Sequence, residues 1–369
     1  MGGIKPEIIK MGTFILIITI VVAVHAYLFW HIWNIVPLSS VWKTVIISMC
    51  LLSFLSLFLY LSPVMDKLPL WIARIIYEVG TSWLIILLYS VILFLLLDIG
   101  RAVHLVPATL MKNSLPGTLG TVLLIIALLF VGNVRYNHKQ LNKISLKSEK
   151  IKKQTKIIFI SDLHLGYHNP RSEFHRWIEL INKENPDLIL IGGDIIDGNI
   201  HPLDVEKTWE EFKNFNAPVY ACLGNHEYLA GREKSIAFYK KAGINLMTDR
   251  SELISDIIII GRDDRSNNNR KPLLELYNQS LKNKFTILLD HQPSDLQEAS
   301  KLGIDLQLSG HTHYGQVWPI SWITDMVYEC AYGQYKKDKT DYYISSGMGI
   351  WGGKFRIGTV SEYVLITIN

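Results

Sequence analysis

Four long stretches without a charged residue dominate the first third of this sequence. Residues 1–134 hold only 11 of the chain's 70 Asp, Glu, Lys and Arg residues. The charge-free stretches are 11–42, 44–65, 79–97 and 113–134. A helix needs about 20 apolar residues to cross a bilayer, and the backbone polar groups of a segment in lipid must bond within that segment. We therefore predict a transmembrane region of about four helices over residues 1–134.

Two other interpretations of these stretches are a buried soluble core and, for the first stretch, a cleavable signal peptide. Four such runs within 134 residues argue against a soluble core. The first run is too long for a signal peptide and lacks a small-residue cleavage pattern. Tryptophans also stand near the ends of the stretches, where aromatic belts form at membrane interfaces. They are Trp30, Trp33, Trp42, Trp71 and Trp83.

A basic segment follows the last apolar stretch. Residues 135–156 carry eight Lys or Arg against one acid, Glu149. We interpret 135–155 as a juxtamembrane linker that lies on anionic headgroups, although a merely solvated linker would have a similar composition. Residues 141–147 alternate apolar and polar side chains, so part of this segment is also a candidate edge strand.

The distribution of basic residues predicts the orientation. With four spans, both termini share one side, which collects Lys5, Lys10, Lys67, Arg74 and the basic segment. The other side has Lys43, Arg101 and Lys112. The positive-inside rule then places the second half of the chain on the cytoplasmic face of the cell membrane. The three cysteines provide no disulfide framework, which fits a reducing compartment.

Residues 156–369 have the composition of a soluble domain and alternate strand-like with helix-like segments. Helices are expected at 172–184 and 205–214. Apolar runs typical of buried strands occur at 156–160, 188–191, 219–223, 257–260, 286–289, 305–308, 342–345 and 362–368. Continuous apolar strands with helices between them indicate a layered α/β fold covered on both faces.

Five polar clusters follow these strand-like runs. They contain Asp162 with His164, Asp194, Asn225 with His226, His291, and His311 with His313. In α/β folds the carboxyl ends of strands form the ligand-binding edge. Asp, Asn and His supply the oxygen and imidazole donors that hold transition-metal ions. Each cluster alone is a weak signal, but five in order at strand ends predict one metal site.

The donor types suit a site with two ions. Asp162 and His164 are two residues apart, so one loop can aim both at a single ion. Asp194 has two oxygens and can bridge two ions, while neutral Asn225 adds a ligand without adding charge. Paired ions clamp the attacking and leaving oxygens of a phosphoryl displacement. His226 is then free to protonate the leaving oxygen or to hold a phosphate oxygen.

These motifs resemble the calcineurin-like metallophosphoesterase superfamily, whose pattern is D-x-H, G-D, G-N-H-[DE], H and G-H-x-H. Residues 156–369 contain every element of that pattern. The tail at 345–349, Trp351-Gly352 and Arg356-Ile357-Gly358 resembles a bacterial membrane-associated branch that often carries N-terminal transmembrane helices. One departure is Tyr314, where that branch has a glycine, and this leaves the substrate preference open.

The resemblance implies a four-layer β-sandwich flanked by helices, that is, an α/β metallophosphoesterase domain at 156–369. It implies one divalent ion held by Asp162, His164, Asp194 and His313, and a second held by Asp194, Asn225, His291 and His311. It also implies His226 as the catalytic histidine. Such sites accept Mn, Fe or Zn, so the identity of the ions stays open between manganese and the other two.

The substrate is constrained by charge and by one apolar segment. Residues 157–369 have a net charge of −6, whereas a nuclease needs an excess of basic residues for the phosphate backbone. Residues 317–328 are apolar and aromatic, which fits either packing in the protein or a rim for acyl chains. We expect as partners the lipid bilayer and a lipid-linked phosphodiester or pyrophosphate, for example UDP-2,3-diacylglucosamine, a precursor in lipid A biosynthesis. A membrane-anchored enzyme for soluble phosphoesters and a catalytically silent sensor are the alternatives.

Overall fold

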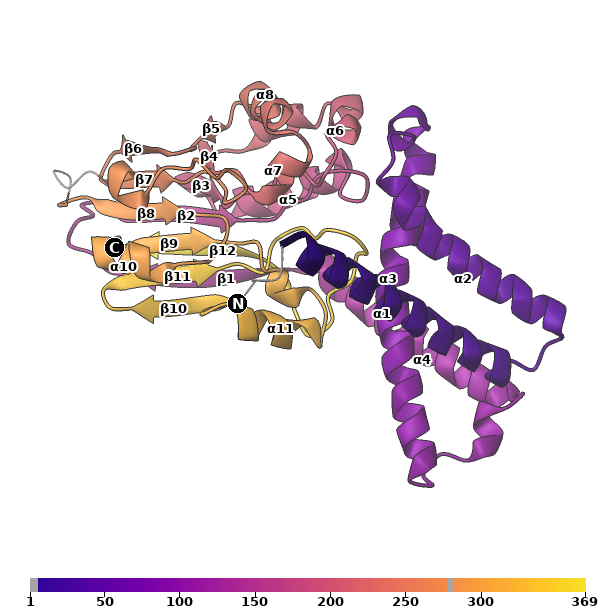
Figure 1. Ribbon diagram of the computed structural model, residues 1–369. Coiled ribbons are helices and arrows are strands. Elements are labelled where there is room, and N and C mark those ends of the chain that lie inside the picture. Colours follow the sequence, from indigo (N-terminus) through magenta and orange to yellow (C-terminus); the bar gives the residue numbers. More distant parts are fainter. Residues whose placement is uncertain (1–5, 278–281) are drawn as a thin grey trace. The chain divides into compact units, whose positions relative to one another are not determined.

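The computed structural model describes residues 6–277 and 282–369 (Figure 1). It divides into two compact units. Residues up to 68 and 75–131 form the first, which we call the helical unit. Residues 69–74 and 132–369 form the second, which we call the sheet unit. Each unit is described by itself.

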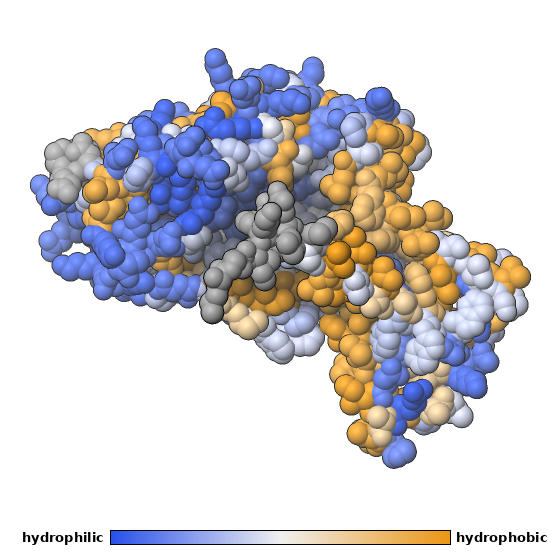
Figure 2. Space-filling view, viewed as in Figure 1, coloured by the Kyte–Doolittle hydropathy of each residue, from blue (hydrophilic) through white to orange (hydrophobic). Residues whose placement is uncertain are grey.

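The helical unit contains the four predicted helices. They are α1 (Pro6–Ile35), α2 (Ser40–Tyr60), α3 (Leu70–Ala102) and α4 (Leu115–Asn137), with 3-10 turns at Met65–Lys67 and Ala108–Met111. Within the described residues, all four helices are long and apolar enough to cross a membrane. Their surface is largely hydrophobic (Figure 2), as lipid-facing helices require. The prediction of four apolar N-terminal helices is therefore confirmed, and each helix is long enough to span a bilayer.

One polar contact ties two of these helices together. The hydroxyl of Tyr27 donates to Asp98 Oδ2 over 2.7 Å, and His31 Nε2 lies 3.1 Å from the same oxygen. The ring of His31 stacks on Phe94 with 4.3 Å between centroids. Ionisable side chains in apolar helices are costly unless they pair, and Asp98 pairs with α1.

The sheet unit is built on two six-stranded sheets. The first has the order β1-β12-β2-β3-β4-β5 and the second β10-β11-β9-β8-β7-β6. The strands of the first sheet are β1 (Lys139–Leu146), β2 (Thr155–Ile160), β3 (Leu188–Ile191), β4 (Val219–Ala221), β5 (Asn245–Leu246) and β12 (Ser361–Ile368). Those of the second are β6 (Arg250–Ile254), β7 (Ile257–Gly261), β8 (Phe285–Leu289), β9 (Leu306–Ser309), β10 (Gly333–Lys337) and β11 (Thr340–Ile344).

Three hydrophobic clusters separate four layers. The central cluster joins side chains of both sheets, such as Phe159 and Leu190 with Leu289 and Leu308. The outer face of the first sheet is covered by helices that include α5 (Arg171–Lys183) and α8 (Arg232–Ala242). The outer face of the second sheet is covered by α9 (Leu273–Leu276) and α10 (Leu296–Leu302). This is the expected four-layer β-sandwich flanked by helices.

The structure differs from the sequence interpretation at two places. The segment assigned as a linker, 135–155, contains β1, which pairs in parallel with β12 over its whole length. The alternation at 141–147 was the informative signal, since β1 is an edge strand of the first sheet. The helix expected at 205–214 is wrong. Here α6 (His201–Glu206) ends at Lys207, whose left-handed φ of 52° breaks the helix before a 3-10 turn at Thr208–Asn214.

The strand directions position the site. In the first sheet β2, β3, β4 and β5 run parallel, and in the second β7, β8, β9 and β11 run parallel. The carboxyl ends of neighbouring parallel strands meet at one edge of their sheet. The loops that leave β2, β3, β4, β8 and β9 carry all five polar clusters.

The burial of β1 can be tested by truncating one side chain. Ile144 is 9% exposed and contacts the core between the sheets. We expect Ile144→Ala to lower the free energy of unfolding of the sheet unit by about 2–4 kcal/mol, because a large aliphatic side chain is lost from a packed core. The neighbouring Lys143→Ala on the exposed face should change it by less than about 0.5 kcal/mol. Urea unfolding measures both, and equal effects would mean that 139–146 is a solvated linker.

Candidate metal centre

Loops at the strand ends bring the predicted donors together. Asp162 follows β2 by two residues and Asp194 follows β3 by three. Asn225 begins α7 (Asn225–Leu229) just after β4, His291 follows β8, and His311 follows β9. Residues up to 151 positions apart in the sequence therefore share one edge of the sandwich, as the sequence pattern predicted.

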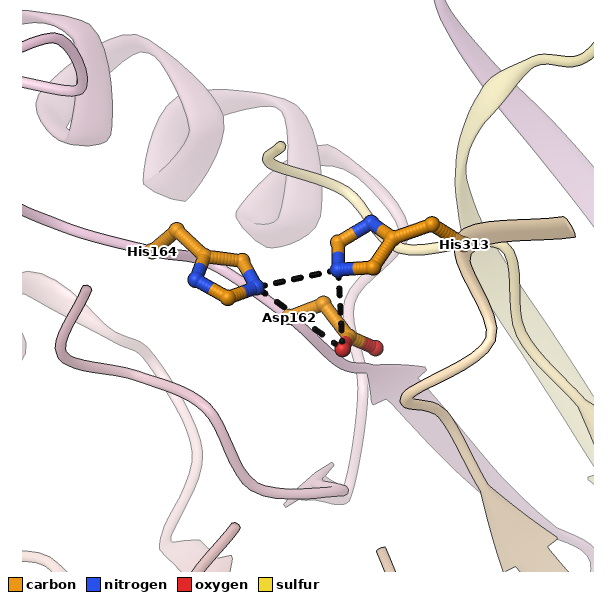
Figure 3. A group of neighbouring side chains, drawn as sticks. All are labelled: Asp162, His164 and His313. Atoms are coloured by element: carbon orange, nitrogen blue, oxygen red, sulfur yellow. Dashed lines mark hydrogen bonds and ion pairs between the residues drawn. The ribbon is translucent and has the colours of Figure 1, made fainter. Parts of the chain in front are cut away.

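The first donor group consists of Asp162, His164 and His313 (Figure 3). The two histidine Nε2 atoms are 3.0 Å apart, and His313 Nε2 lies 3.3 Å from Asp162 Oδ1. His164 Nε2 is 3.9 Å from the same carboxylate oxygen. Two imidazole nitrogens and a carboxylate thus converge on a single point, with all three side chains almost fully buried.

The second donor group contains Asp194, His291 and His311. His291 Nε2 lies 3.1 Å from Asp194 Oδ2 and 3.2 Å from Asn225 Oδ1. His311 Nδ1 is 2.8 Å from the same Asn225 oxygen. Asp194 also connects the two groups, because its Oδ2 lies 3.7 Å from His164 Nε2.

The backbone at this site is conformationally strained. Asp162, His164, Asp194, His311 and His313 all have positive φ, between 44° and 71°. Residues other than glycine rarely adopt this left-handed region, at a cost of roughly 1–3 kcal/mol each. Close packing imposes a second demand: a Cβ at Gly310 would lie 1.9 Å from Ser161 Oγ and 2.2 Å from Asp162 Oδ2. Such strain concentrated on the donors is typical of a functional site.

The far nitrogens of two of these histidines, His291 and His164, are anchored as in metal centres. His291 Nδ1 donates to the carbonyl of Gly192 over 2.7 Å, and His164 Nδ1 lies 3.2 Å from Asp197 Oδ1. Metal-binding histidines almost always donate their second N–H to a carbonyl or carboxylate, which points the other nitrogen at the ion. The buried donor set and these outer contacts together fit divalent metal ions.

Asp197 links two of the histidines. Besides its contact with His164, its carbonyl accepts a hydrogen bond from His226 Nδ1 over 2.7 Å. Burial acts to raise the pKa of Asp197, but the hydrogen bond and charge of His164 hold that pKa below its ordinary value. Asp197 therefore orients the rings of both His164 and His226.

Glu227 fixes the loop that carries Asp194. This fully buried carboxylate accepts from the backbone N–H groups of Gly224, Asp194 and Ile196, over 2.7, 3.1 and 3.0 Å. It thus clamps the loop after β3 to the loop after β4. Burial, followed by the charge of Asp194, raises the pKa of Glu227 to about 7.

Arg356 supports the backbone of His313 from the side opposite the metal centre. The fully buried guanidinium donates to the carbonyls of His313, Ser346 and Gly349 over 2.8, 2.5 and 3.0 Å. Burial lowers the pKa of Arg356 to about 10, so it stays charged at neutral pH. The loop that it binds in turn donates from Gly349 N–H to the carbonyl of Asp162 over 3.0 Å.

Glu362 completes this support from β12. Its buried carboxylate accepts from the Tyr343 hydroxyl and the Ser346 N–H, over 2.9 and 3.0 Å. It also accepts from Asn142 of β1. A carboxylate can be buried when several donors replace its water, and here those donors connect the edge strand with the loop at 345–349.

The charges of the site are strongly interdependent. Burial acts to raise the pKa of Asp194, but the neighbouring His291 and His226 hold it well below its ordinary value. Burial acts to lower the pKa of His291, but Asp194 holds it well above its ordinary value. Burial and the nearby His291 lower the pKa of His311 to about 4. Such mutually perturbed groups are characteristic of functional sites.

The site is closed on one side and open on the other. Asp162, His164, Asp194 and His291 are at most 2% exposed. Asn225, His226 and His311 are partly exposed. A ligand therefore reaches the centre past His226 and His311.

All eight predicted site residues lie within this one centre, although their individual roles stay predictions. Sequence reasoning assigned no role to Asp197, Glu227, Arg356 or Glu362. Glu227 and Arg356 stand within motifs that were recognised, so their positions carried a signal. Asp197 is separated from Asp194 only by two isoleucines, and its distance from the strand end gave no indication that it contacts two histidines.

The role of Arg356 as a positioning residue can be tested with a charge-conserving variant. Arg356→Lys keeps the charge, but one ammonium cannot reach carbonyls on both the 313 and 346–349 segments. We expect Mn²⁺ affinity to fall by roughly 10–100-fold, the usual cost of losing a contact that supports metal ligands. Isothermal titration measures this, with exposed Arg176→Lys as the control. A lower melting temperature with unchanged Mn²⁺ affinity would show that Arg356 supports only the fold.

Comparison with known proteins adds to this geometry. The family model for calcineurin-like phosphoesterases matches residues 155–315. An uncharacterized metallophosphoesterase from Campylobacter jejuni is 30% identical over 238 residues, which cover 62% of this chain and 63% of that protein. This chain thus spans less than two thirds of that relative's length. A Danio rerio transmembrane protein with metallophosphoesterase domain is 28% identical over 233 residues, 58% of this chain and 53% of that protein.

One relative is matched over nearly its whole length. An uncharacterized metallophosphoesterase from Aquifex aeolicus is 31% identical over 242 residues, which cover 62% of this chain and 92% of that protein. The four apolar helices and the zebrafish relative together indicate a membrane protein. The matched motifs, the four-layer sandwich and the convergent Asp and His donors lead to one conclusion: this chain belongs to the calcineurin-like metallophosphoesterases.

Proposed function

We propose that this protein is a membrane-anchored phosphoesterase with two divalent metal ions, which hydrolyses a phosphodiester or pyrophosphate bond of a lipid-linked substrate. The observation that carries the proposal is the pair of donor groups joined by Asp194. Family membership supports phosphoester chemistry.

Asp162, His164, Asp194 and His313 would hold one ion, and Asp194, Asn225, His291 and His311 the other. Both sets follow the convergence of nitrogen and oxygen donors described above. When bound, a pair of divalent ions activates the attacking water and neutralises charge on the phosphoryl oxygens. The donor set accepts Mn, Fe or Zn, and we take manganese as the working choice.

His226 is the proposed proton donor to the leaving oxygen. Its Nδ1 is occupied by the carbonyl of Asp197, which directs Nε2 away from that anchor. Its backbone N–H donates to Asp194 Oδ1 over 2.9 Å, so the ring is tied to the carboxylate that joins the two donor groups. Its side chain is partly exposed on the open side of the centre, where a substrate enters. A histidine so placed can transfer a proton during departure of the alcohol or phosphate.

A lipid-linked substrate is supported by the helices that the chain carries besides the metal centre. The same chain carries four helices that can span a bilayer. The net charge of −6 over residues 157–369 disfavours a nucleic acid, which requires a basic surface. UDP-2,3-diacylglucosamine, whose pyrophosphate bond lies next to a diacylated sugar, is the leading candidate in this class. Soluble phosphoesters are the competing class.

The activity can be tested with full-length protein in lipid nanodiscs loaded with Mn²⁺. The substrates are bis-p-nitrophenyl phosphate, p-nitrophenyl phosphate and UDP-2,3-diacylglucosamine. Asp194→Ala should lose bound metal and all turnover, because it removes the donor common to both groups. His226→Gln should retain metal but lose roughly 10²–10⁴-fold in kcat, the usual worth of a general acid.

The control for these variants is His138→Gln, which changes an exposed histidine outside the site. Full kcat in His226→Gln would contradict its role as the acid. Turnover of the soluble esters without any turnover of the lipid would favour the anchored soluble-substrate enzyme. Metal binding without turnover of any of the three esters would favour the silent sensor.

The proposed orientation places the sheet unit on the cytoplasmic face, because basic residues concentrate on that side of the four spans. Lys339 is exposed in the turn between β10 and β11, so Lys339→Cys provides a reporter. A membrane-impermeant thiol reagent should label this cysteine only after bacterial cells that express the protein are opened. Labelling of intact cells would reverse the orientation.

A further inference from the structure

The last turn of α4 belongs to the sheet unit. Contacts of this turn therefore show which parts of the sheet unit lie next to the end of an apolar helix. Residues 132–137 of the helix lie in that unit, whereas the apolar part up to 131 does not. The carbonyl of Gly132 accepts from the N–H of Arg356 over 2.9 Å, and Asn133 Nδ2 donates to the carbonyl of Lys354 over 3.1 Å. The first charged residue after the span is Arg135. Segment 354–357 therefore contacts the part of α4 that directly precedes its first charged residue, Arg135.

The segment at 354–357 also contacts the start of α11 (Ile320–Val327). The N–H of Trp318 donates to the carbonyl of Ile357 over 2.7 Å. On its other side Ile357 packs so closely against Gly132 that a Cβ there would lie 2.9 Å from Ile357 Cγ1. Ile357 alone thus separates Gly132 of α4 from Trp318, which stands two residues before the start of α11.

The surface of α11 within the sheet unit is apolar and exposed. Trp322 is 60% exposed, Ile323 55%, Met326 77% and Val327 67%. The helix carries no basic residue, and its one charge, Asp325, accepts from the Tyr314 hydroxyl over 3.3 Å. A contiguous apolar patch of this kind, with tryptophan at its edge, suits the boundary between headgroups and acyl chains.

Both ends of α11 are connected to the metal centre. Its N-terminal side follows the turn His313–Gly315, which carries a donor of the first group. At its C-terminal side the ring of Tyr328 meets the ring of His311 edge-on, 6.3 Å between centroids. The depth of α11 in a membrane therefore determines the depth of the open side of the centre, where His311 is partly exposed.

We propose that α11 inserts its apolar face into the bilayer interface and so holds the mouth of the metal centre at the level of lipid headgroups. The occupant of this face is the lipid, because Ile357 contacts both Trp318, which precedes α11, and Gly132, which stands three residues before the first charged residue after the apolar run of α4. The insertion deepens the proposed function and rests on it only for the consequence that lipid phosphoesters reach the site. Apolar contact drives the insertion, so zwitterionic and anionic lipids should serve equally.

The depth of α11 can be measured on the full chain in nanodiscs. A nitroxide on Met326→Cys, with Cys50 and Cys330 replaced by serine, reports collisions with oxygen, which enriches in lipid, and with a nickel chelate, which stays in water. We expect high oxygen and low nickel accessibility, alike in phosphatidylcholine and phosphatidylglycerol discs. The matched control is Leu253→Cys. Leu253 is 46% exposed and lies on β6, the edge strand of the second sheet opposite β10.

Three results would contradict the insertion of α11 into the bilayer interface. Nickel accessibility at 326 equal to that at 253 would place α11 in water. Low accessibility to both reagents would show that α11 is packed against protein instead of lipid. A high oxygen signal only in anionic discs would also contradict apolar insertion and indicate binding by charge.

Kinetic measurements then distinguish the proposed insertion of α11 from the proposed substrate class. The double variant Trp322→Ser with Met326→Ser should raise KM for UDP-2,3-diacylglucosamine in nanodiscs by about tenfold or more, as expected when two apolar side chains no longer contact lipid. It should leave kcat/KM for bis-p-nitrophenyl phosphate unchanged, as should Leu253→Ser for both substrates. Equal loss on both esters would contradict the positioning role. A label in lipid without hydrolysis of the lipid ester would refute only the proposed substrate class.

Discussion

The carboxylate of Asp194 is the contact on which the rest of the site depends. It reaches both donor groups, with His291 on one side and His164 on the other. A buried carboxylate is costly unless charges and hydrogen bonds replace water, so the fold must supply several partners at once. It does so by joining loops from both sheets, and Glu227 fixes the spacing of two of those loops through three backbone N–H groups. The two-sheet architecture is thus the means by which one carboxylate is shared.

The sequence predicted which polar side chains come together because their signal is local. An apolar run that ends in Asp-x-His or Gly-Asn-His predicts a strand and also the polar side chains at its end. This prediction does not require the partner strand to be known. The supporting residues carry no such signal. Arg356 donates to the backbone carbonyls of His313 and Gly349. Because every residue has a backbone carbonyl, the sequence does not show which ones an arginine will bind. Asp197 is recognised as an orienting group only when His164 and His226 are seen around it.

Boundaries were less predictable than motifs for a related reason. Composition changes sharply near residue 134, and the sheet unit begins close to it, at residue 132, so the basic segment after it belongs to a packed unit. Tyr136 on α4 is fully buried in the core of the sheet unit, and Asn142 of β1 contacts the buried Glu362. Basic residues in this segment suggested a linker, although Ile144 is buried between the sheets and Lys139 packs over the rings of Tyr136 and Trp177. The prediction of a helix at 205–214 was wrong because it was interrupted by a single residue in the left-handed region, Lys207. Such a residue has no reliable sequence signature.

The position of β12 has a consequence for biosynthesis. This strand lies between β1 and β2 in the first sheet, although it is the last strand of the chain. The pairing of residues near 140 with residues near 362 is a contact of long sequence separation, which forms late. The membrane helices precede it and can insert while the sheet is still open. A nascent chain of this protein therefore exposes an unpaired, apolar β2 edge until residues 361–368 have been made, and an open edge of this kind is prone to pairing with other chains.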